Sequence, residues 1–543
     1  MAEKQLASAE RYMDDRDKER VVVEVTHRVM DAYARDPRKV EQALFDTLYE
    51  ERLRLRTEKD KDEVKRLSGY YKRMQKEAAI AGQERQRELL QGLIGHYTEE
   101  VSGHFDKRVY RAATTIMPAL ITGLLNTMSP LKLLRGIPRG DLETMGDQMV
   151  LQGETELFRD LAGKGTIVLV ATHSSHMDSI MLGWAIYRLG LPPFTYGAGM
   201  NLFSNPILGF FMHNLGAYKV DRRKKAELYK DVLKAYCGCT IEMGYNNMFF
   251  PGGTRTRSGA TEEHLKMGLL GQGLDAYIHN LRNKKEKPDV FVVPVSINYQ
   301  LVLEAETLID DYLKEVGKSR YIITDDEFSK PQVVLDFVRK LFSLDSKIHV
   351  TVGRPLDVFG NAVDDEGNSV DRRGRVIDRR RYVFRRGRPA FDMQRDREYT
   401  MELARAITDS FHRDTVIKST NLVSSAVFTW LREQNPEVDL YKLLRAGGVE
   451  PDVPLRDVYR RMELTLKALH RLSDYGRVRM DQTLSRGDTV LMMGEALAHF
   501  QSFHQQAAMV RHGDRLAHCD RNLIYYYRNR LTGFDLKDVE VGP

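Results

Sequence analysis

Residues 166–190 read TIVLVATHSSHMDSIMLGWAIYRLG, and this stretch decides the fold class. Its first part, Thr166–Thr172, is apolar and rich in β-branched side chains, which is the pattern of a strand buried on both faces. Its last part, Ser179–Gly190, has apolar residues at helical spacing and ends on a glycine, as many helices do. A buried strand that leads directly into a helix is the building unit of α/β proteins.

Three further stretches predict strands of the same kind later in the chain. They are NMFF before Pro251, the run Asp289–Tyr299 and the run Lys347–Gly353. Because helical patterns separate the first strand from these runs, the sequence predicts an α/β fold with a mixed, largely parallel sheet flanked by helices.

The pattern changes along the 543 residues, a length that is too great for one core. Residues 1–110 have apolar residues at helical spacing and predict an N-terminal helical domain, and the α/β domain follows over residues 111–355. Residues 356–395 are rich in Gly, Asp and Arg, which predicts an irregular, hairpin-like insertion. Residues 396–543 are again helical in pattern and predict a C-terminal helical domain.

The composition narrows the class of protein. With 42% hydrophobic and 29% charged residues, the chain is expected to fold rather than stay disordered. Its three cysteines form no even framework, so we expect a reducing compartment. The densely charged residues 1–21 lack the apolar core of a secretory signal. Residues 112–131 are uncharged but contain Pro118 and Asn126, so we interpret them as a helix on a membrane surface or against the protein core.

A cluster of arginines dominates the predicted insertion. The stretch Asp371–Arg388 has nine arginines against two aspartates. Such a cluster would be attracted to an anionic lipid surface or to nucleic acid, and a solvated hairpin is an equally good interpretation. Only Tyr382 and Phe384 are interleaved aromatic residues, so we do not expect nucleic acid as a partner.

The strongest chemical signal is THSSHMDS, directly after the first strand. His173 and Asp178 are close enough in sequence for a strand-to-helix turn to bring the carboxylate to the imidazole. An aspartate holds the tautomer of a histidine, and an imidazole of pKa about 6.5 suits general-base work near neutral pH. Two alternatives remain open. The histidines could serve only at the start of a helix, or His173, His176 and Asp178 could hold a metal, although this set has few ligands.

Three other motifs combine cations, glycines or proline near predicted strand ends. The stretch Gly216–Lys225 contains Arg222 and Arg223, whose planar groups suit a phosphate. The stretch Phe249–Gly259, FFPGGTRTRSG, combines a Gly-rich turn with two arginines and suits an anion, although such loops are common. In VPVSINY, Pro294 argues for a strand end or a bulge.

Taken together, HSSHMD, GAYKVDRR, FPGGTRTR and VPVSINY resemble the four motif blocks of the glycerolipid acyltransferases. The closest likeness is to the large glycerol-3-phosphate and dihydroxyacetone-phosphate O-acyltransferases. The blocks are spread over Val168–Tyr299, and YYYRNRL at Tyr525–Leu531 is a weaker likeness to a sequence near the carboxyl end of those enzymes.

This resemblance implies roles for individual residues. It implies that His173 is the catalytic base, that Asp178 is its charge partner, and that backbone N–H groups after His173 stabilise the oxyanion. It implies no metal and no organic cofactor, with acyl-CoA or acyl-acyl-carrier protein as the acyl donor. The positions implied to bind or shape the substrate are Arg222, Arg223, Gly253, Thr254, Arg255, Arg257 and Pro294.

The resemblance also implies a reaction. We expect sn-1 acylation of glycerol 3-phosphate to lysophosphatidate, the first step of phospholipid synthesis, by a peripheral protein on the cytoplasmic face of a membrane. Dihydroxyacetone phosphate or lysophosphatidate as acceptor, and a non-catalytic lipid-binding relative, are the alternatives. The chain departs from the family at Gly252, where the third block usually has a glutamate, and at Ser174, where the large enzymes commonly have arginine.

Overall fold

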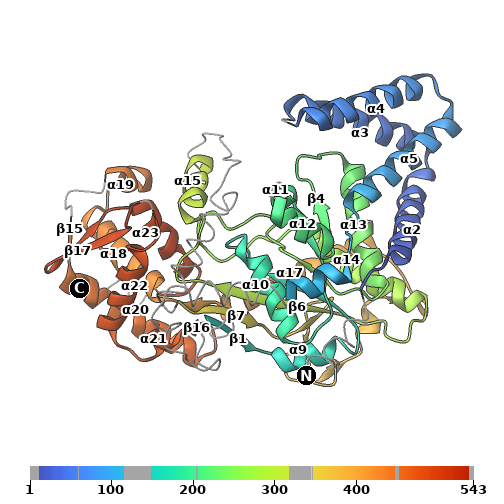
Figure 1. The fold of residues 1–543 in the computed structure, drawn as a ribbon. Coiled ribbons are helices and arrows are strands. Elements are labelled where there is room, and N and C mark those ends of the chain that lie inside the picture. Colours follow the sequence, from blue (N-terminus) through green and yellow to red (C-terminus); the bar gives the residue numbers. More distant parts are fainter. Residues whose placement is uncertain are drawn as a thin grey trace, which may run out of the picture.

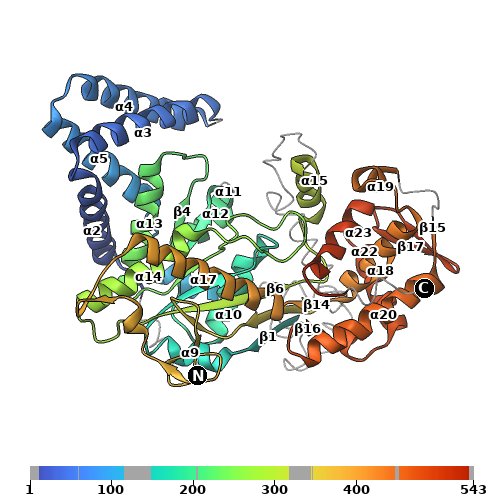
Figure 2. The same ribbon diagram turned by 180° about the vertical axis from the view of Figure 1, so that it is seen from behind.

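The computed structural model describes most of the chain, namely residues 12–58, 60–114, 148–203, 206–316, 344, 346–446, 452–504 and 506–536. A mixed sheet lies at the centre, with an N-terminal group of helices beyond one end and a C-terminal, mainly helical region beyond the other (Figure 1). Turned by 180°, the same three parts follow one another along the molecule (Figure 2).

The core of the sheet is five parallel strands in the order β6-β2-β5-β3-β4. Because parallel strands all point the same way, their carboxyl ends meet at one edge, where α/β proteins place their sites. The strands are β6 (Val290–Asn298), β2 (Thr166–Ala171), β5 (Asn247–Phe249), β3 (Thr195–Gly199) and β4 (Ala217–Val220).

Antiparallel strands extend the sheet beyond β6. Both β7 (Ile348–Val352) and β8 (Leu356–Asp357) pair antiparallel with β6, and β1 (Met149–Gly153) pairs parallel with β7. The predicted α/β class with a largely parallel sheet is therefore confirmed. Short pairs follow in the Arg-rich region, namely β9 (Ala362–Val363), β10 (Ser369–Val370), β11 (Val376–Ile377), β12 (Phe384–Arg385) and β13 (Arg388–Pro389), with the short 3₁₀ helix η3 (Arg379–Tyr382).

Of the two alternatives expected at Pro294, a strand end or a bulge, the structure has the bulge: the registers of β6 with β7 and with β8 differ by one residue, so Val293 and Pro294 face three residues, 353–355. Pro294 lies inside β6 and pairs in register with Val170 of β2. Its carbonyl oxygen accepts a hydrogen bond from Gly353 N at 2.8 Å, so its ring nitrogen faces the same side, between the ends of β7 and β8. At this gap the missing N–H breaks no ladder bond, and a central strand can accommodate the proline.

Helices cover both faces of the sheet. In β2, Ile167 and Leu169 belong to a core with α9 and α10, whereas Val168 and Val170 belong to a core with α13, α14 and α17. Alternate side chains of a strand point to opposite faces, so both faces of β2 are buried, as its apolar sequence predicts. These helices are α9 (Thr155–Leu161), α10 (Met177–Arg188), α13 (Glu227–Glu242), α14 (Met267–Arg282) and α17 (Met393–Arg413).

The N-terminal helices form their own core against α13. Asp14, Asp36 and Asp60 accept hydrogen bonds from the first backbone N–H groups of α2, α3 and α4, which is why these helices begin where they do. The pair α3 and α4 stands away from the sheet (Figure 1). The helices are α2 (Asp15–Ala34), α3 (Pro37–Thr57), α4 (Lys61–Ile80) and α5 (Gln83–Val101).

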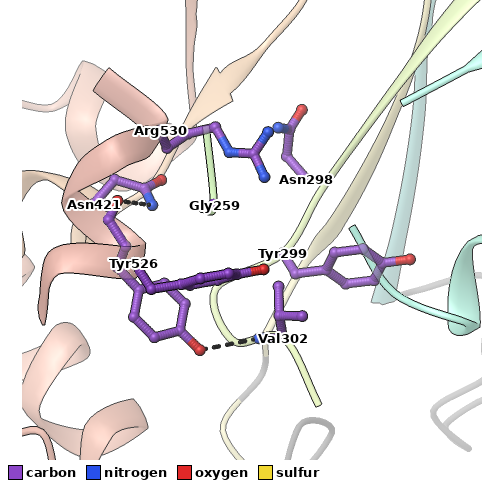
Figure 3. Close-up of a pocket in the computed structure, with 8 residues that line it drawn as sticks. Gly259, Asn298, Tyr299, Val302, Asn421, Tyr526 and Arg530 are labelled. Carbon is purple, nitrogen blue, oxygen red and sulfur yellow. Dashed lines mark hydrogen bonds between the residues drawn. The ribbon is translucent and has the colours of Figure 1, made fainter. Parts of the chain in front are cut away.

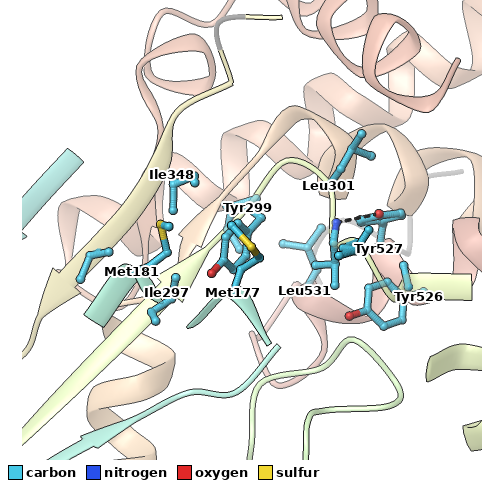
Figure 4. Packing of buried hydrophobic residues seen from close by; sticks show 14 of the residues in the cluster. Met177, Met181, Ile297, Tyr299, Leu301, Ile348, Tyr526, Tyr527 and Leu531 are labelled. Atoms are coloured by element: carbon cyan, nitrogen blue, oxygen red, sulfur yellow. Dashed lines mark hydrogen bonds between the residues drawn. The ribbon is translucent and has the colours of Figure 1, made fainter. Parts of the chain in front are cut away.

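The C-terminal region shares one continuous core with α10 and β6. Figure 4 shows Met177 and Tyr299 close to Tyr526, Tyr527 and Leu531. The helices are α18 (Ser419–Gln434), α19 (Leu440–Ala446), α20 (Leu455–Asp474), α21 (Gln482–Ser485), α22 (Thr489–Phe500), α23 (Arg521–Arg528) and the 3₁₀ helix η4 (Asn529–Leu531). Short strands accompany them, namely β14 (Val416–Ile417), β15 (Asp452–Pro454), β16 (Arg479–Met480), β17 (Met509–His512) and β18 (Arg515–His518).

Two sequence expectations concern membranes. None of the described helices combines the length and the apolarity needed to cross a bilayer. The stretch 112–131 is described only as far as residue 114, so most of it lies outside the described residues. The Arg-rich region meets the sheet at its amino edge, because Arg379 pairs with Asp289 just before β6 and Lys164 Nζ donates to Asp365 O just before β2.

Candidate active site

The turn after β2 carries the histidine and aspartate of the first motif. His173 Nδ1 lies 2.9 Å from Asp178 Oδ2 across the 173–176 turn, and Asp178 is fully buried in the first turn of α10. Because the carboxylate accepts the Nδ1 proton, the lone pair is on Nε2. Tyr299, just after β6, donates a hydrogen bond from its hydroxyl to Asp178 Oδ1 at 2.6 Å.

Carboxylates accept every backbone N–H of this turn. Glu262 Oε1 accepts from His173 N at 2.7 Å, Asp178 Oδ2 accepts from Ser174 N at 2.7 Å and from Ser175 N at 2.9 Å, and Glu304 Oε1 accepts from His176 N at 3.0 Å. The expectation that these N–H groups stabilise an oxyanion is therefore not met, because each already donates to an acidic side chain.

The imidazole of His173 lies flat against an aromatic ring. Its centroid is 3.9 Å from that of Phe250, with an angle of 12° between the planes, and its side chain is 10% exposed. Burial lowers the pKa of His173 below 6.5, and the positive charges of Arg255 and Arg222 act in the same direction against the opposing effect of Asp178. The imidazole is therefore neutral at neutral pH, as a general base must be.

The third motif folds back onto His173. Thr256 N donates a hydrogen bond to His173 O at 2.7 Å, and the turn begins where Gly253 N donates to Phe250 O at 3.0 Å. Gly253 has φ of +76°, and a Cβ there would stand 2.7 Å from the side chain of Lys266, so this position requires glycine. Thr254 is half-buried beside it.

Four cations gather at this edge of the sheet. Burial and the charges of Arg255 and Arg257 lower the pKa of Arg222, and burial and Arg222 lower the pKa of Lys266. Arg255 Nη1 lies 3.4 Å from Glu304 Oε1, and Arg257 Nη1 lies 2.5 Å from Glu315 Oε2. Within the described part of the chain, no carboxylate pairs with Arg222 or Lys266. We use the name cation cluster for the side chains of Arg222, Arg255, Arg257 and Lys266.

The second motif places its two arginines differently. Arg223 is held by Asp221, at 2.8 Å from Nη2 to Oδ2, and by Glu58 of the N-terminal helices, at 2.6 Å from Nη1 to Oε2. Burial alone would raise the pKa of Asp221, but the hydrogen bonds and the charge of Arg223 outweigh it, so the pKa is lowered. Arg222 belongs to the cation cluster instead: its side chain is partly open to solvent, but it lies deep enough, and close enough to Arg255 and Arg257, for lost hydration and their charges to lower its pKa. The structure therefore brings Arg222, but not Arg223, to the cations beside His173.

The N-terminal helices hold the rest of this loop. Lys224 Nζ is buried, 3.2 Å from Glu51 Oε1 and 2.8 Å from Glu100 Oε2, and it lies over the ring of Tyr97. Since acidic residues of the helical region neutralise the cations after Arg222, they position the loop that presents it.

An apolar cavity of about 210 Å³ lies beside α10. Its wall includes Ser179, which follows Asp178 directly, so the cavity begins next to the first motif. Apolar and aromatic side chains make up most of the wall, among them Ile180, Trp184, Phe194, Phe211 and Met248.

Several residues at the site were not found from the sequence. Glu262, Glu304 and Lys266 reach the turn or the cation cluster from outside the four motif blocks, and Arg530 lies in the YYYRNRL stretch, to which the sequence assigned no role. A lone Glu or Lys in a loop has no local pattern, so only the folded chain identifies it. No group of three or more His, Cys, Asp or Glu side chains in the described ranges could hold a metal ion.

Comparison with known proteins adds to this geometry. Residues 149–298 match the family model described as Acyltransferase. The chain is 28% identical over 240 residues to the glycerol-3-phosphate acyltransferase of Pseudomonas paraeruginosa, covering 44% of this chain and 25% of that protein. It is 35% identical over 165 residues to the glycerol-3-phosphate acyltransferase of Pseudoalteromonas translucida, covering 30% of this chain and 19% of that protein. It is 30% identical over 262 residues to the one of Aeromonas hydrophila, covering 48% of this chain and 28% of that protein.

A solved structure also matches. It is the 1-acyl-sn-glycerophosphate acyltransferase of Thermotoga maritima, at a TM-score of 0.22 and 16% identity, covering 46% of this chain and 90% of that one. The chain spans between about a fifth and just over a quarter of the length of the curated relatives named above. Residues 149–298 are therefore similar to the Acyltransferase family model, and the chain is similar to part of the glycerol-3-phosphate acyltransferases named above.

Proposed function

We propose that the protein transfers a fatty acyl group from an acyl thioester to the sn-1 hydroxyl of glycerol 3-phosphate and so forms lysophosphatidate. The observation that carries the proposal is the closeness of a neutral imidazole, His173, to the cation cluster, in which Arg222 and Lys266 lack a carboxylate partner among the described residues. A base beside uncompensated cations suits an acceptor that has both a hydroxyl and a phosphate.

The cation cluster is the proposed phosphate site. Burial and the like charges of Arg255 and Arg257 lower the pKa of Arg222, and a phosphate dianion would relieve the repulsion among these charges. Arg255 and Arg257 already have acidic partners, so we expect Arg222 and Lys266 to supply most of the attraction. Gly253 lets the backbone turn tightly beside them.

His173 performs the proposed proton transfers. Its Nε2 takes the proton of the acceptor hydroxyl while the oxygen forms a bond to the thioester carbonyl carbon. Asp178 stabilises the imidazolium through Nδ1–H. The tetrahedral intermediate then breaks its C–S bond, and the thiolate takes the proton back from Nε2 and leaves as a thiol. These steps need no metal and no organic cofactor, as the resemblance implies.

The apolar cavity beside α10 is the proposed place of the acyl chain. It starts at Ser179, the residue after Asp178, and its wall is mostly apolar. An alkyl chain that leaves water for such a wall gains roughly 0.8 kcal/mol for each buried CH₂.

The test is a panel of acceptors. The full-length chain is given labelled acyl-CoA or acyl-acyl-carrier protein with glycerol 3-phosphate, dihydroxyacetone phosphate or lysophosphatidate in turn. We expect the highest kcat/KM with glycerol 3-phosphate. A clear preference for lysophosphatidate would overturn the acceptor and keep the reaction class. His173→Ala should abolish transfer while donor binding persists, and His264→Ala, an exposed histidine in the loop after the third motif, is the control.

The phosphate site has its own test. Arg222→Met should raise the KM for glycerol 3-phosphate about 10- to 100-fold, which is the loss of a charge-assisted contact. Lys225→Met, an exposed cation in the same loop, is the control and should leave KM unchanged. Equal effects of the two variants would show that only the overall charge matters.

We also propose peripheral association with the cytoplasmic face of a membrane, because the product is a lipid. The Arg-rich region does not support this proposal, since it lies at the amino edge of the sheet, away from His173. Sedimentation with anionic and neutral phospholipid vesicles tests it, and absence of the protein from both pellets would refute it.

A further inference from the structure

Glu262 is a buried carboxylate that the proposed reaction does not use. Its Oε1 accepts the backbone N–H of His173 at 2.7 Å, and its Oε2 is enclosed without a hydrogen-bond partner among the described residues. Gly252 lies beside the Glu262 side chain, because a Cβ at Gly252 would stand 3.2 Å from Glu262 Cγ. A carboxylate therefore lies beside the one position of the third motif that departs from the family, although another part of the chain provides it.

Arg530 approaches the same turn from the carboxyl end of the chain. It lies in η4, is only 7% exposed, and donates a hydrogen bond from Nη2 to Ser174 Oγ at 3.0 Å. Its Nη1 is buried without a partner within the described residues. Figure 3 shows the guanidinium extending past Tyr526 toward Asn298.

The segment that carries Arg530 is docked closely against the third motif. Gly259 has φ of +81°, and a Cβ there would stand 2.2 Å from Tyr526 O, so the two backbones are in direct contact. Asn529 Nδ2 donates to Ser258 O at 2.9 Å, and Val302 N donates to the hydroxyl of Tyr527 at 3.1 Å. The place of Arg530 is thus determined by contacts at several points.

The two groups influence each other. Burial raises the pKa of Glu262 to about 7, and the positive charge of Arg530 opposes this rise while the negative charge of Asp178 adds to it. The acidic side chain holds His173 and the basic one holds Ser174, so the pair acts on the first two residues of the 173–176 turn.

We propose that Glu262 and Arg530 are positioning residues of this turn, which fix the imidazole of His173 relative to the acceptor. The inference rests on the proposed role of His173 as the base. Glu262 lies outside the quoted motifs, Arg530 lies in the YYYRNRL stretch near the carboxyl end, and neither is expected to touch the reacting atoms. Because proton transfer requires hydrogen-bond reach, a small displacement of the turn should lower kcat more than it raises KM.

Glu262→Ala is the first variant. We expect kcat to fall about 10- to 100-fold, with the KM of the acceptor within about 3-fold of its original value, since the turn loses one anchor. Glu263→Ala, the same change at the exposed neighbouring residue, should keep the original kcat. A rise in KM at unchanged kcat for Glu262→Ala would overturn the positioning role and indicate contact with the acceptor.

Arg530→Ala is the second variant, and guanidinium is the probe. We expect a similar loss of kcat and its partial recovery on addition of guanidinium chloride well below denaturing concentrations, with equal sodium chloride giving none. Arg528→Ala, two residues away, should keep kcat. If guanidinium does not restore kcat while circular dichroism and the melting temperature of Arg530→Ala match the original protein, the proposal fails for Arg530.

A readout without turnover separates this inference from the proposed function. Carbethoxylation of His173 by diethyl pyrocarbonate, followed by peptide mass spectrometry over pH 5–8, reports on the imidazole directly. We expect Glu262→Ala and Arg530→Ala to change its rate or midpoint and the two controls to leave both unchanged. Unaltered profiles in both variants would overturn the inference, whatever acceptor the protein uses. The transfer rates of all variants are measured with the acceptor that the unaltered protein prefers, so that the comparison does not depend on which acceptor this is.

Discussion

The hydroxyl of Tyr299 and the carboxylate of Asp178 meet at 2.6 Å, on the oxygen of Asp178 that does not face His173. The other oxygen accepts from His173 Nδ1 and from two backbone N–H groups. Both oxygens of Asp178 therefore act only as hydrogen-bond acceptors, and this arrangement suits the ionised carboxylate.

Asp178→Asn should abolish most activity. An amide in this place presents donors to Ser174 N–H or to His173 Nδ1, so the tautomer with a free Nε2 is no longer favoured. We expect kcat to fall about 10²- to 10⁴-fold, as in other histidine–aspartate pairs, with acceptor binding retained. Steady-state kinetics and acceptor titration by calorimetry measure the two effects. A change confined to KM would contradict the role of Asp178.

Tyr299→Phe should destabilise the fold and reduce kcat modestly. It leaves Asp178 Oδ1 buried without its donor, at a cost of about 1–3 kcal/mol in the free energy of unfolding. Tyr526→Phe is a matched control, because the hydroxyl of Tyr526 is buried without a partner among the described residues. Chemical denaturation of both variants should show a loss only for Tyr299→Phe.

Activity should fall on the acid side of neutrality. The pKa of His173 is lowered below 6.5, so the imidazole is neutral and able to accept a proton at pH 7 and becomes protonated only at lower pH. We expect kcat/KM to be constant at high pH and to decrease below a midpoint under 6.5. A profile that rises as the pH falls through 6 would exclude neutral His173 as the base.

Stability should decrease over a defined range of acid pH. Burial lowers the pKa of His504 to about 4 and, with the charge of Lys418, the pKa of His349 to about 3. A histidine whose pKa is lower in the folded state stabilises the fold above its unfolded value of about 6.5, and this contribution is lost as the pH falls toward the folded value. The melting temperature should therefore decline from pH 6.5 to 4, and His504→Gln should decline less.

Gly252→Glu should lower activity, although the related families have a glutamate there. A side chain at this position would meet Glu262 Cγ at 3.2 Å and bring a second carboxylate beside the first. Combining Gly252→Glu with Glu262→Gly should recover part of the loss, because one carboxylate again lies in that space. Kinetics of the two single variants and of the double variant test this coupling.

Part of this fold could be predicted from local sequence. The strands β2, β6 and β7 are rich in apolar and β-branched residues, and β5 is a short run that ends in Phe249, so the sequence predicts each of them. The strands β3 (TYGAG) and β4 (AYKV) were not predicted, because one is rich in glycine and the other is short and ends in the basic loop. Pro294 predicts the bulge that the structure has there, but its place opposite the junction of β7 and β8 depends on the whole sheet and has no local signal.

Some residues of the candidate site could likewise be predicted from local sequence, and others could not. His173 and Asp178 are separated by one turn, so their sequence spacing already predicts their contact. The different positions of Arg222 and Arg223 depend on Glu58, which follows the end of α3 far away in the sequence, and no motif contains that information. Glu262, Glu304 and Arg530 join the turn only through the tertiary fold.

The donors and acceptors around the 173–176 turn have a consequence for cutting and recombining the chain. The segment that matches the family model ends at residue 298, one residue before Tyr299. An excised piece with those limits would leave Asp178 Oδ1, His176 N–H and Ser174 Oγ without their partners and would expose the apolar faces of α10 and β6 to water. A functional transplant into a relative should therefore extend from β1 to Leu531.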